Sequence, residues 1–228
     1  MVDLYWRNIW EQKGCHDAKN PNDGALAAMA GRDPETFDRD DRCSKWLKDC
    51  LNRDQKKILE VGCGSGLYID QLSGATVHGN DLSLTMVSHL KSRCASLSLL
   101  QCIAWDLPYL DESFDVAFSN SVYMFFPNEN RAEKAFREMV RVIRPGGSGA
   151  VIDVHDEDKR SAYEKYKLDT LGEEEFLRRK ENGLVHLHLS KDWFRVLADE
   201  LHLNMTILDE DPEVHATAHV KYDVFFTK

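Results

Sequence analysis

The chain has 228 residues, of which 43% are hydrophobic and 30% are charged, and its formal net charge is −10 at pH 7. This length suits a single domain with a full-sized core, and the acidic charge argues against a nucleic-acid partner, which would need a clustered basic face. No apolar run reaches the roughly 18 residues of a membrane span, and the charges scattered through residues 1–14 do not fit a signal peptide. The six cysteines lack metal or disulfide spacing, so we expect reduced thiols in a cytoplasmic protein.

Strands and helices are expected to alternate through the first two thirds of the chain. Residues 1–38 carry turn signals and are expected to be irregular, whereas a helical apolar stripe begins near Asp40. The pattern then predicts strands at 56–62, 75–80, 98–103, 114–120 and 149–154, and helices at 65–72, 83–94 and 131–143. Such alternation predicts βαβ units and therefore a mostly parallel sheet with helices on both faces.

The last third of the chain shows a different pattern. Residues 155–183 are charged and helical, residues 184–189 suggest a short extended piece, and Ser190 is expected to cap a further helix. Two strands at 203–210 and 219–227 follow, too close in sequence for a helical crossover, so they should pair antiparallel.

The expected fold is therefore α/β, a doubly wound seven-stranded Rossmann-like sheet with an antiparallel last strand and helical lid insertions. We expect one domain over residues 1–228. Its expected parts are an N-terminal cap (1–38), a cofactor-binding core (40–154), a helical insertion over the substrate site (155–190), and a final helix with the antiparallel strand pair (191–228).

The segment ILEVGCGSGLYI places three glycines at alternate positions after an expected strand. Gly62, Gly64 and Gly66 allow a tight turn against which a ligand can lie. A P-loop would end in Gly-Lys-Ser/Thr, and a dinucleotide fingerprint would need glycine where Leu67 stands. Glu60 in the preceding strand favours a cationic ligand over a pyrophosphate. S-adenosylmethionine, which carries a sulfonium and an amino group and no phosphate, fits this pattern; a turn without a ligand is the alternative.

Two further acids follow the next strands. Asp81 lies 19 residues after Gly62, where a carboxylate can accept hydrogen bonds from ribose hydroxyls, although it can also cap the next helix. Asp106 follows the third strand and can accept from the exocyclic amine of adenine, while Leu107 packs on the ring. The alternative for Asp106 is an exposed loop acid.

These segments resemble the class I S-adenosylmethionine-dependent methyltransferases of the methyltransferase type 11 group. The matching blocks occur in family order over about residues 56–153 and are ILEVGCGSG, GNDLS, LPYLDESFD, FDVAFSNSVYMFF and REMVRVIRPGG. The resemblance implies a seven-stranded sheet, S-adenosylmethionine as the cofactor and methyl transfer to a small molecule.

The resemblance also implies roles for individual residues. The methionine part would lie against Glu60 and the three glycines, ribose and adenine against Asp81, Leu82, Asp106 and Leu107, and the amino-acid end near Ser119 and Asn120. Residues 119–123 read Ser-Asn-Ser-Val-Tyr, whereas enzymes that methylate the exocyclic amine of adenine resemble Asn-Pro-Pro-Tyr, so methylation of nucleic-acid bases is not expected.

Four residues are candidates for catalysis. A base is needed only if the acceptor must lose a proton near the transition state. His155 follows the fifth strand, His186 and His188 would point to one side of an extended segment, and Tyr123 follows the fourth strand. Each can instead be a packing or surface residue. His186 and His188 could also ligate a metal, but no third ligand is visible, so no metal is expected.

Two other functions fit parts of the pattern. A nicotinamide-dependent oxidoreductase could share this sheet, and Tyr163 and Lys167 have the Tyr-x-x-x-Lys spacing of such enzymes, although they lie in a charged helical segment. A non-catalytic relative that binds the cofactor is the other alternative, against which the intact set of glycines and acids argues.

Overall fold

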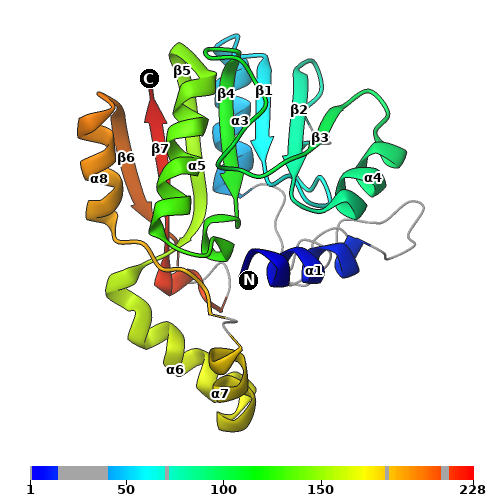
Figure 1. Cartoon of the computed structure of the whole chain (residues 1–228). Helices are drawn as coiled ribbons and strands as arrows, with labels where there is room; N and C mark the ends of the chain where they lie inside the picture. The colour runs from blue at the N-terminus through cyan, green and yellow to red at the C-terminus, as the bar shows by residue number, and fades with distance from the viewer. Residues whose placement is uncertain (1, 15–40, 70–71, 183–184, 212–215) are drawn as a thin grey trace.

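The chain folds around one sheet of seven strands. The computed structural model describes residues 2–14, 41–69, 72–182, 185–211 and 216–228. The strands lie in the order β3-β2-β1-β4-β5-β7-β6, as Figure 1 shows. They are β1 (Lys57–Val61), β2 (Thr76–Asp81), β3 (Ser98–Gln101), β4 (Phe114–Asn120), β5 (Ile143–His155), β6 (Asn204–Asp209) and β7 (Lys221–Thr227).

The direction of the strands confirms the predicted fold class. β1 to β5 pair in parallel, whereas β7 is antiparallel to both of its neighbours, β5 and β6. The chain leaves β1 for β2 on one side and reaches β4 on the other, so the order reverses between β1 and β4. Ligands of open α/β sheets bind at such a reversal, outside the carboxyl ends of the strands.

Two helices cover each face of the sheet. The apolar side of α5 (Glu129–Val142) and that of α8 (Lys191–Glu200) bury Phe136 and Phe194 in one core cluster. On the other face, α3 (Arg42–Asn52) and α4 (Leu84–Arg93) bury Leu47 and Leu90 in a second cluster. Ser190 accepts a hydrogen bond from the Trp193 amide at 3.1 Å, which confirms it as the cap of α8.

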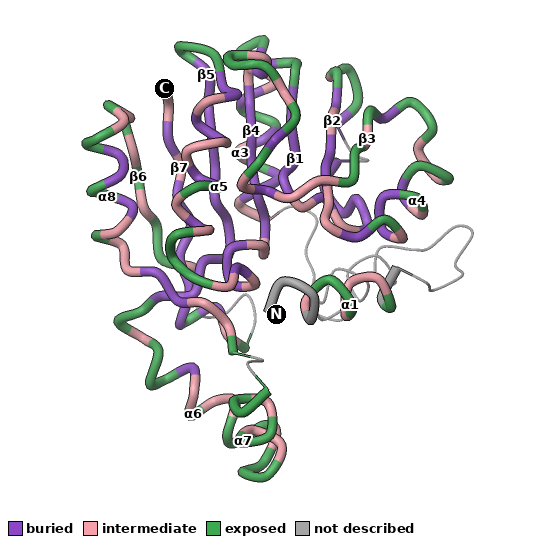
Figure 2. The backbone as a smooth tube through the Cα atoms, in the orientation of Figure 1, coloured by how far each residue is buried: buried purple, intermediate pink, exposed green. Residues whose placement is uncertain are grey.

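The remaining helices gather at the carboxyl end of the sheet. α1 (Val2–Gly14) lies across this end, and α6 (Arg160–Leu171) and α7 (Glu173–Glu181) extend beyond it as a hairpin (Figure 1). Figure 2 shows buried central strands, more exposed edge strands β3 and β6, and a hairpin that is mostly exposed. In the described part of the chain, no helix is both long and apolar enough to cross a membrane.

Two sequence predictions are wrong within the described residues. Residues 2–14 are helical rather than irregular, because Trp6, Ile9 and Trp10 form a short stripe that the turn signals further along the chain obscured. A helix does not begin at Ser65, because the chain continues in turns to residue 68, and only Ile69 has a 3-10 helical conformation. The backbone there remains tied in a tight loop, in which Gly66 has φ of 82° and donates to the Cys63 carbonyl at 2.8 Å. Residues 70–71 and the segment 15–40, which includes Cys15, lie outside the described residues.

Candidate functional site

A cavity opens at the carboxyl ends of β1, β2 and β4, where the strand order reverses. The empty space between its walls is about 970 Å³ when the open mouth is included. Its wall combines the glycine loop, the ends of β2 and β4, residues 102–105, and aromatic side chains from α1 and from residues 122–127. The cavity therefore lies where the sheet topology predicts a ligand.

The glycine loop is shaped by its backbone. The amides of Gly62 and Cys63 both donate to the Asn80 carbonyl, at 2.8 and 2.9 Å, so that the loop folds back over the end of β2. Gly62 has φ of 77°, and a Cβ there would lie 2.4 Å from Cγ2 of Val122. Gly64 has φ of 47° and open space where a Cβ would stand. The loop therefore presents bare backbone to the cavity, as a closely bound ligand requires.

Asp81, at the end of β2, connects the glycine loop to the start of α4. Its Oδ2 accepts from the Gly64 amide and its Oδ1 accepts from the Ser83 amide, both at 2.9 Å. Burial raises the pKa of Asp81, although these amide hydrogen bonds act in the opposite direction. The alternative of Asp81 as the cap of α4 is wrong, since Ser83 is the capping residue and accepts from the Met86 amide at 3.2 Å. The Asp81 carboxylate instead holds the glycine loop and lines the cavity.

Two carboxylates give the cavity its charge preference. Glu60 lies 3% exposed at the end of β1, and both Glu60 and Asp81 line the cavity. Trp6 and Trp10 reach the same wall from α1, and their indole faces attract cations. A cationic ligand that also carries hydroxyl groups fits this donor and acceptor set, and S-adenosylmethionine has both features.

Six of the ten predicted cofactor residues line the cavity: Glu60, Gly62, Gly64, Asp81, Leu82 and Asn120. The other four do not. Gly66 packs against Leu90, and a Cβ there would lie 2.3 Å from its Cδ1. Asp106 is exposed, Leu107 is buried in the core, and Ser119 is buried within β4. Their role in cofactor binding stays a prediction.

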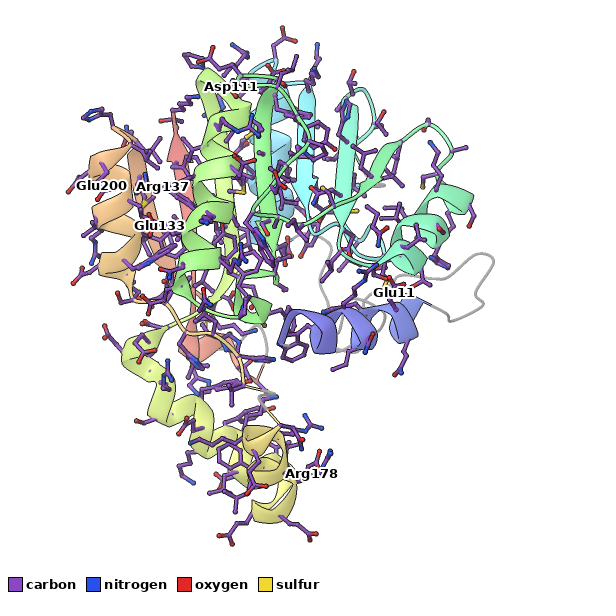
Figure 3. All side chains as sticks on the ribbon, viewed as in Figure 1. Glu11, Asp111, Glu133, Arg137, Arg178 and Glu200 are labelled. Atoms are coloured by element: carbon purple, nitrogen blue, oxygen red, sulfur yellow. The ribbon has the colours of Figure 1, made fainter. Side chains whose placement is uncertain are left out.

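The N-terminal helix is held on this site by Glu11, which the sequence did not single out. Glu11 Oε1 accepts from the Leu84 amide at 2.9 Å, and Oε2 accepts from the Thr85 amide at 3.0 Å. Figure 3 shows Glu11 on the side of α1 that faces α4. Burial raises the pKa of Glu11, but the hydrogen bonds from Thr85, Leu84 and Ser83 outweigh it, so the net pKa is lowered. A carboxylate at a helix N-terminus is favoured by the helix dipole as well.

Aromatic rings form the outer wall of the cavity. The ring centroid of Phe125 lies 4.7 Å from that of Trp6 and 5.2 Å from that of Trp10, and Trp105 lies 5.7 Å from Phe126. The sequence makes five aromatic residues candidates for this wall, with plain core packing as the alternative: Tyr5, Trp6, Tyr123, Phe125 and Phe126. Trp6, Phe125 and Phe126 line the cavity and Tyr123 does not, whereas Trp10 and Trp105 line it without having been assigned to it. The helical spacing of Trp6 and Trp10 was the signal for a shared face.

The three candidate histidines meet at the base of the α6–α7 hairpin. The ring of His155 lies 4.9 Å from that of His186 and 5.1 Å from that of His188, measured between centroids. Tyr163 joins them from α6, and its hydroxyl lies 2.7 Å from Nδ1 of His186. His186 also contacts Phe125 and Trp6, at 5.2 and 5.7 Å between centroids. The cluster therefore lies directly behind the aromatic wall of the cavity.

Burial keeps these histidines neutral. It lowers the pKa of His155 well below its usual range, with His186 and Lys221 adding to the effect. Burial, then Lys167 and Lys221, lowers the pKa of His186 to about 3. Burial and Arg160 lower the pKa of His188. Among the described residues, no group of three or more His, Cys, Asp or Glu side chains is arranged to hold a metal ion.

Tyr123 lies apart from both the cavity and the histidines. Its side chain is 2% exposed and packs against Phe126 and Phe194 in the core, at 4.9 and 6.1 Å between ring centroids. Its hydroxyl makes no hydrogen bond to any described residue. This position argues against a catalytic role for Tyr123.

A buried ion pair links the cavity to the histidine cluster. Ser121 lines the cavity, and its hydroxyl forms a short hydrogen bond with Asp153. Asp153 pairs with Nζ of Lys221 at 2.5 Å. Ser121 and Asp153 have φ of 56° and 67°, and β5 changes register between Val151 and Val154. Such non-glycine conformations cost about 1–3 kcal/mol and concentrate at functional sites.

Comparison with known proteins agrees with this geometry. Residues 59–151 match a family model described as a methyltransferase domain. "Methyltransferase GfsG" of Streptomyces halstedii is 34% identical over 107 residues, which cover 43% of this chain and 37% of that protein. A tRNA (carboxymethyluridine(34)-5-O)-methyltransferase of Arabidopsis thaliana is 36% identical over 90 residues, 40% of this chain and 22% of that protein. The chain thus spans well under half the length of these relatives.

A solved structure extends the likeness of the fold to the whole chain. Magnesium protoporphyrin IX methyltransferase (ChlM) from Synechocystis PCC 6803, with bound SAH, superposes with a TM-score of 0.67 at 13% identity and covers 100% of both chains. The match to a methyltransferase family argues against the nicotinamide alternative. Tyr163 of the Tyr-x-x-x-Lys spacing is instead bonded to His186.

Proposed function

The chain carries a class I S-adenosylmethionine-dependent methyltransferase domain, and we propose that it moves a methyl group to an oxygen or nitrogen of a small molecule by in-line displacement. The observation that carries the proposal is the single cavity in which bare glycine backbone faces the buried carboxylates of Glu60 and Asp81. Glu60, Gly62 and Gly64 would hold the methionine part of the cofactor, and Asp81 and Leu82 would hold ribose and adenine. Bound there, the cofactor supplies a methyl carbon already activated by the sulfonium.

The protein then has mainly to orient the acceptor. Correct orientation can supply about 7–11 kcal/mol of the barrier. The aromatic wall of Trp6, Trp10 and Phe125 favours an acceptor with an apolar or aromatic body. The acidic net charge, −10 at pH 7, favours such a molecule over RNA, although RNA is the substrate class named for the Arabidopsis relative.

None of the three candidate histidines lines the cavity, so the choice of a base among them rests on their ring nitrogens and on the effect of burial on their pKa. Nδ1 of His188 lies 3.1 Å from the His186 carbonyl, which can only accept, so Nδ1 carries the proton and Nε2 carries a lone pair. Nε2 is buried and has no partner among the described residues. His186, with a pKa of about 3, is a poor base near neutral pH. We therefore assign proton removal, where the acceptor requires it, to His188 rather than to His155 or His186.

Titration calorimetry with S-adenosylmethionine tests the cofactor site. Asp81→Ala removes a charge-assisted acceptor worth about 1.5–3 kcal/mol, so affinity should fall about 10- to 150-fold. Asp115→Asn is the matched control, because Asp115 also ties backbone amides, those of Lys56 and Lys57 at 2.9 and 2.8 Å, but at the opposite end of the sheet. Unchanged affinity in Asp81→Ala would refute the assignment.

Three further outcomes separate the alternatives. Stabilisation by NADH rather than S-adenosylmethionine in a thermal shift would favour an oxidoreductase. Failure to form S-adenosylhomocysteine with any acceptor pool would favour a non-catalytic binder. Methylation of a tRNA pool in preference to a metabolite pool would replace the small-molecule acceptor with RNA.

A further inference from the structure

The base of the α6–α7 hairpin holds a cation that the rest of the described protein does not neutralise. Lys167 lies half-buried on α6, and its Nζ is 5.5 Å from the ring centroid of Tyr163. The described residues offer Lys167 no carboxylate within ion-pair distance, although its neighbour in sequence, Lys165, pairs with Asp169 at 2.6 Å. A half-buried ammonium without a carboxylate partner is unusual, because the loss of hydration is then uncompensated.

The carboxylates on the hairpin and just before it form ion pairs with other cations. Glu164 lies 3.7 Å from Lys180, and Glu175 pairs with both Arg178 and Arg179, at 2.6 and 2.7 Å. Glu157, before the hairpin, pairs with Arg160 at 2.5 Å. None of these three carboxylates therefore forms an ion pair with Lys167.

The groups around Lys167 are hydrogen-bond donors or further cations. Lys221 lies behind the histidines and is matched by Asp153, so one positive charge remains in excess. The hydroxyl of Tyr163 lies 2.7 Å from Nδ1 of His186. In either tautomer of His186 this pair keeps one donor for another acceptor: Nε2–H when the hydroxyl donates to Nδ1, or the Tyr163 hydroxyl when Nδ1–H donates to it. Tyr163 is the only buried residue of α6, so the helix is fixed to the fold through this cluster.

The electrostatic effects agree with this geometry. Burial, Arg179 and Lys221 lower the pKa of Lys167. Lys167 is in turn the largest charge effect that lowers the pKa of His186. The two results describe one electropositive cluster of side chains in a protein whose net charge is −10.

We infer that this cluster is an oxyanion subsite, in which Lys167 and the one free donor of the Tyr163–His186 pair receive a carboxylate or phosphate group carried by the acceptor. An anion there restores the missing counter-charge and gains charge-assisted hydrogen bonds. The cluster lies against Trp6 and Phe125, which also line the cavity, so an acceptor can place its anion at the hairpin and its apolar body along the aromatic wall. The statement that this subsite belongs to the acceptor site rests on the proposed methyl transfer.

The test is an anion titration of the full-length protein with sodium acetate and inorganic phosphate. The imidazole resonances of His155, His186 and His188 report binding by NMR, and sodium chloride at matched ionic strength provides the baseline. Lys167→Met should weaken acetate binding about 10- to 150-fold, as expected for the loss of one charge-assisted hydrogen bond. Lys165→Met, which changes an exposed and already paired lysine on the same helix, should leave binding unchanged.

A second variant tests whether a loss of acetate binding in Lys167→Met comes from misfolding. Lys167→Arg retains the charge and should restore binding to within a few-fold of the unaltered protein. Equal acetate affinity in all three variants, or shifts that sodium chloride reproduces, would overturn the subsite. Calorimetry with S-adenosylmethionine on the same samples separates the two proposals, because Lys167→Met should bind the cofactor normally. Anion binding without cofactor binding would leave the subsite standing and refute the methyltransferase assignment alone.

Discussion

The cavity is bordered by two regions that are built in different ways. The glycine loop, residues 62–66, is held by backbone hydrogen bonds to the Asn80 carbonyl and by Asp81. The cap, which comprises α1 and the described residues of 155–190, is held by the side chains of Glu11 on α4, Trp6 on Phe125 and Tyr222 on the Leu189 carbonyl, together with one backbone hydrogen bond from the Leu187 amide to the Met124 carbonyl. A loop whose backbone needs positive φ accepts few residue types other than glycine, whereas many different side chains can hold a helix on a surface. The comparison therefore predicts that single substitutions are most damaging in the loop.

Gly62→Ala should have the largest effect on stability. The new Cβ would lie 2.4 Å from Cγ2 of Val122, and φ of 77° is unfavourable for alanine. Strain of about 1–2 kcal/mol and overpacking of about 1–3 kcal/mol give a loss of about 2–5 kcal/mol in the free energy of unfolding. Urea unfolding measures it, and S-adenosylmethionine affinity should fall in parallel because both residues line the cavity.

Gly74→Ala is the control for this substitution. Gly74 has φ of 83°, but nothing lies within 4 Å of the position of its Cβ. It should lose only the strain of about 1–2 kcal/mol and keep its cofactor affinity. Equal losses in the two variants would show that the fit against Val122 is unimportant and that the loop is no more restrictive than an exposed turn.

The same contrast explains what could be read from the sequence. β4 was predicted at 114–120 and occurs at Phe114–Asn120, because a short segment rich in apolar residues between turn signals fixes a buried strand locally. The three glycines and Asp81 were found because their positions depend on the backbone of adjacent elements. The absence of a helix at residues 65–68 was missed, since the alternation of strands and helices suggested one directly after the loop.

The cap was only partly predictable. Its helical character between residues 160 and 181 follows from local pattern, and the three histidines were candidates from their positions after β5 and in an extended segment. Nothing in the sequence shows that Tyr163 binds His186, because 23 residues separate them. Glu11 was missed for the same reason, since its partners lie 72–74 residues away.

Glu11→Gln should have an intermediate effect that is confined to the cap. Glutamine keeps one acceptor oxygen, but its amino group would face an N–H of the α4 terminus, so about 1–3 kcal/mol should be lost locally. Hydrogen exchange at the Leu84 and Thr85 amides should then quicken about 5- to 150-fold. Arg7→Gln is the control, because its exposed contact with Glu11 spans 3.9 Å and is worth less than about 1 kcal/mol. Unchanged exchange in Glu11→Gln would show that α1 is held by its aromatic contacts instead.

Tyr123→Phe should have the smallest effect. It tests whether the buried side chain of Tyr123, in the core beneath the site, takes part in the reaction. The Tyr123 hydroxyl is buried and makes no hydrogen bond to any described residue, so its removal leaves no partner behind. The free energy of unfolding should change by less than about 1 kcal/mol, in the stabilising direction, and the turnover number should stay within about two-fold.

Tyr222→Phe is the matched control, because the buried Tyr222 hydroxyl donates to the Leu189 carbonyl at 2.8 Å and ties the cap to the sheet. That variant should lose about 0.5–1.5 kcal/mol, since it removes one hydrogen bond from the Leu189 carbonyl, which still accepts from the Glu157 amide at 3.2 Å. A drop of ten-fold or more in the turnover number of Tyr123→Phe, with stability unchanged, would instead return Tyr123 to the catalytic site and require its ring to leave the core during the reaction.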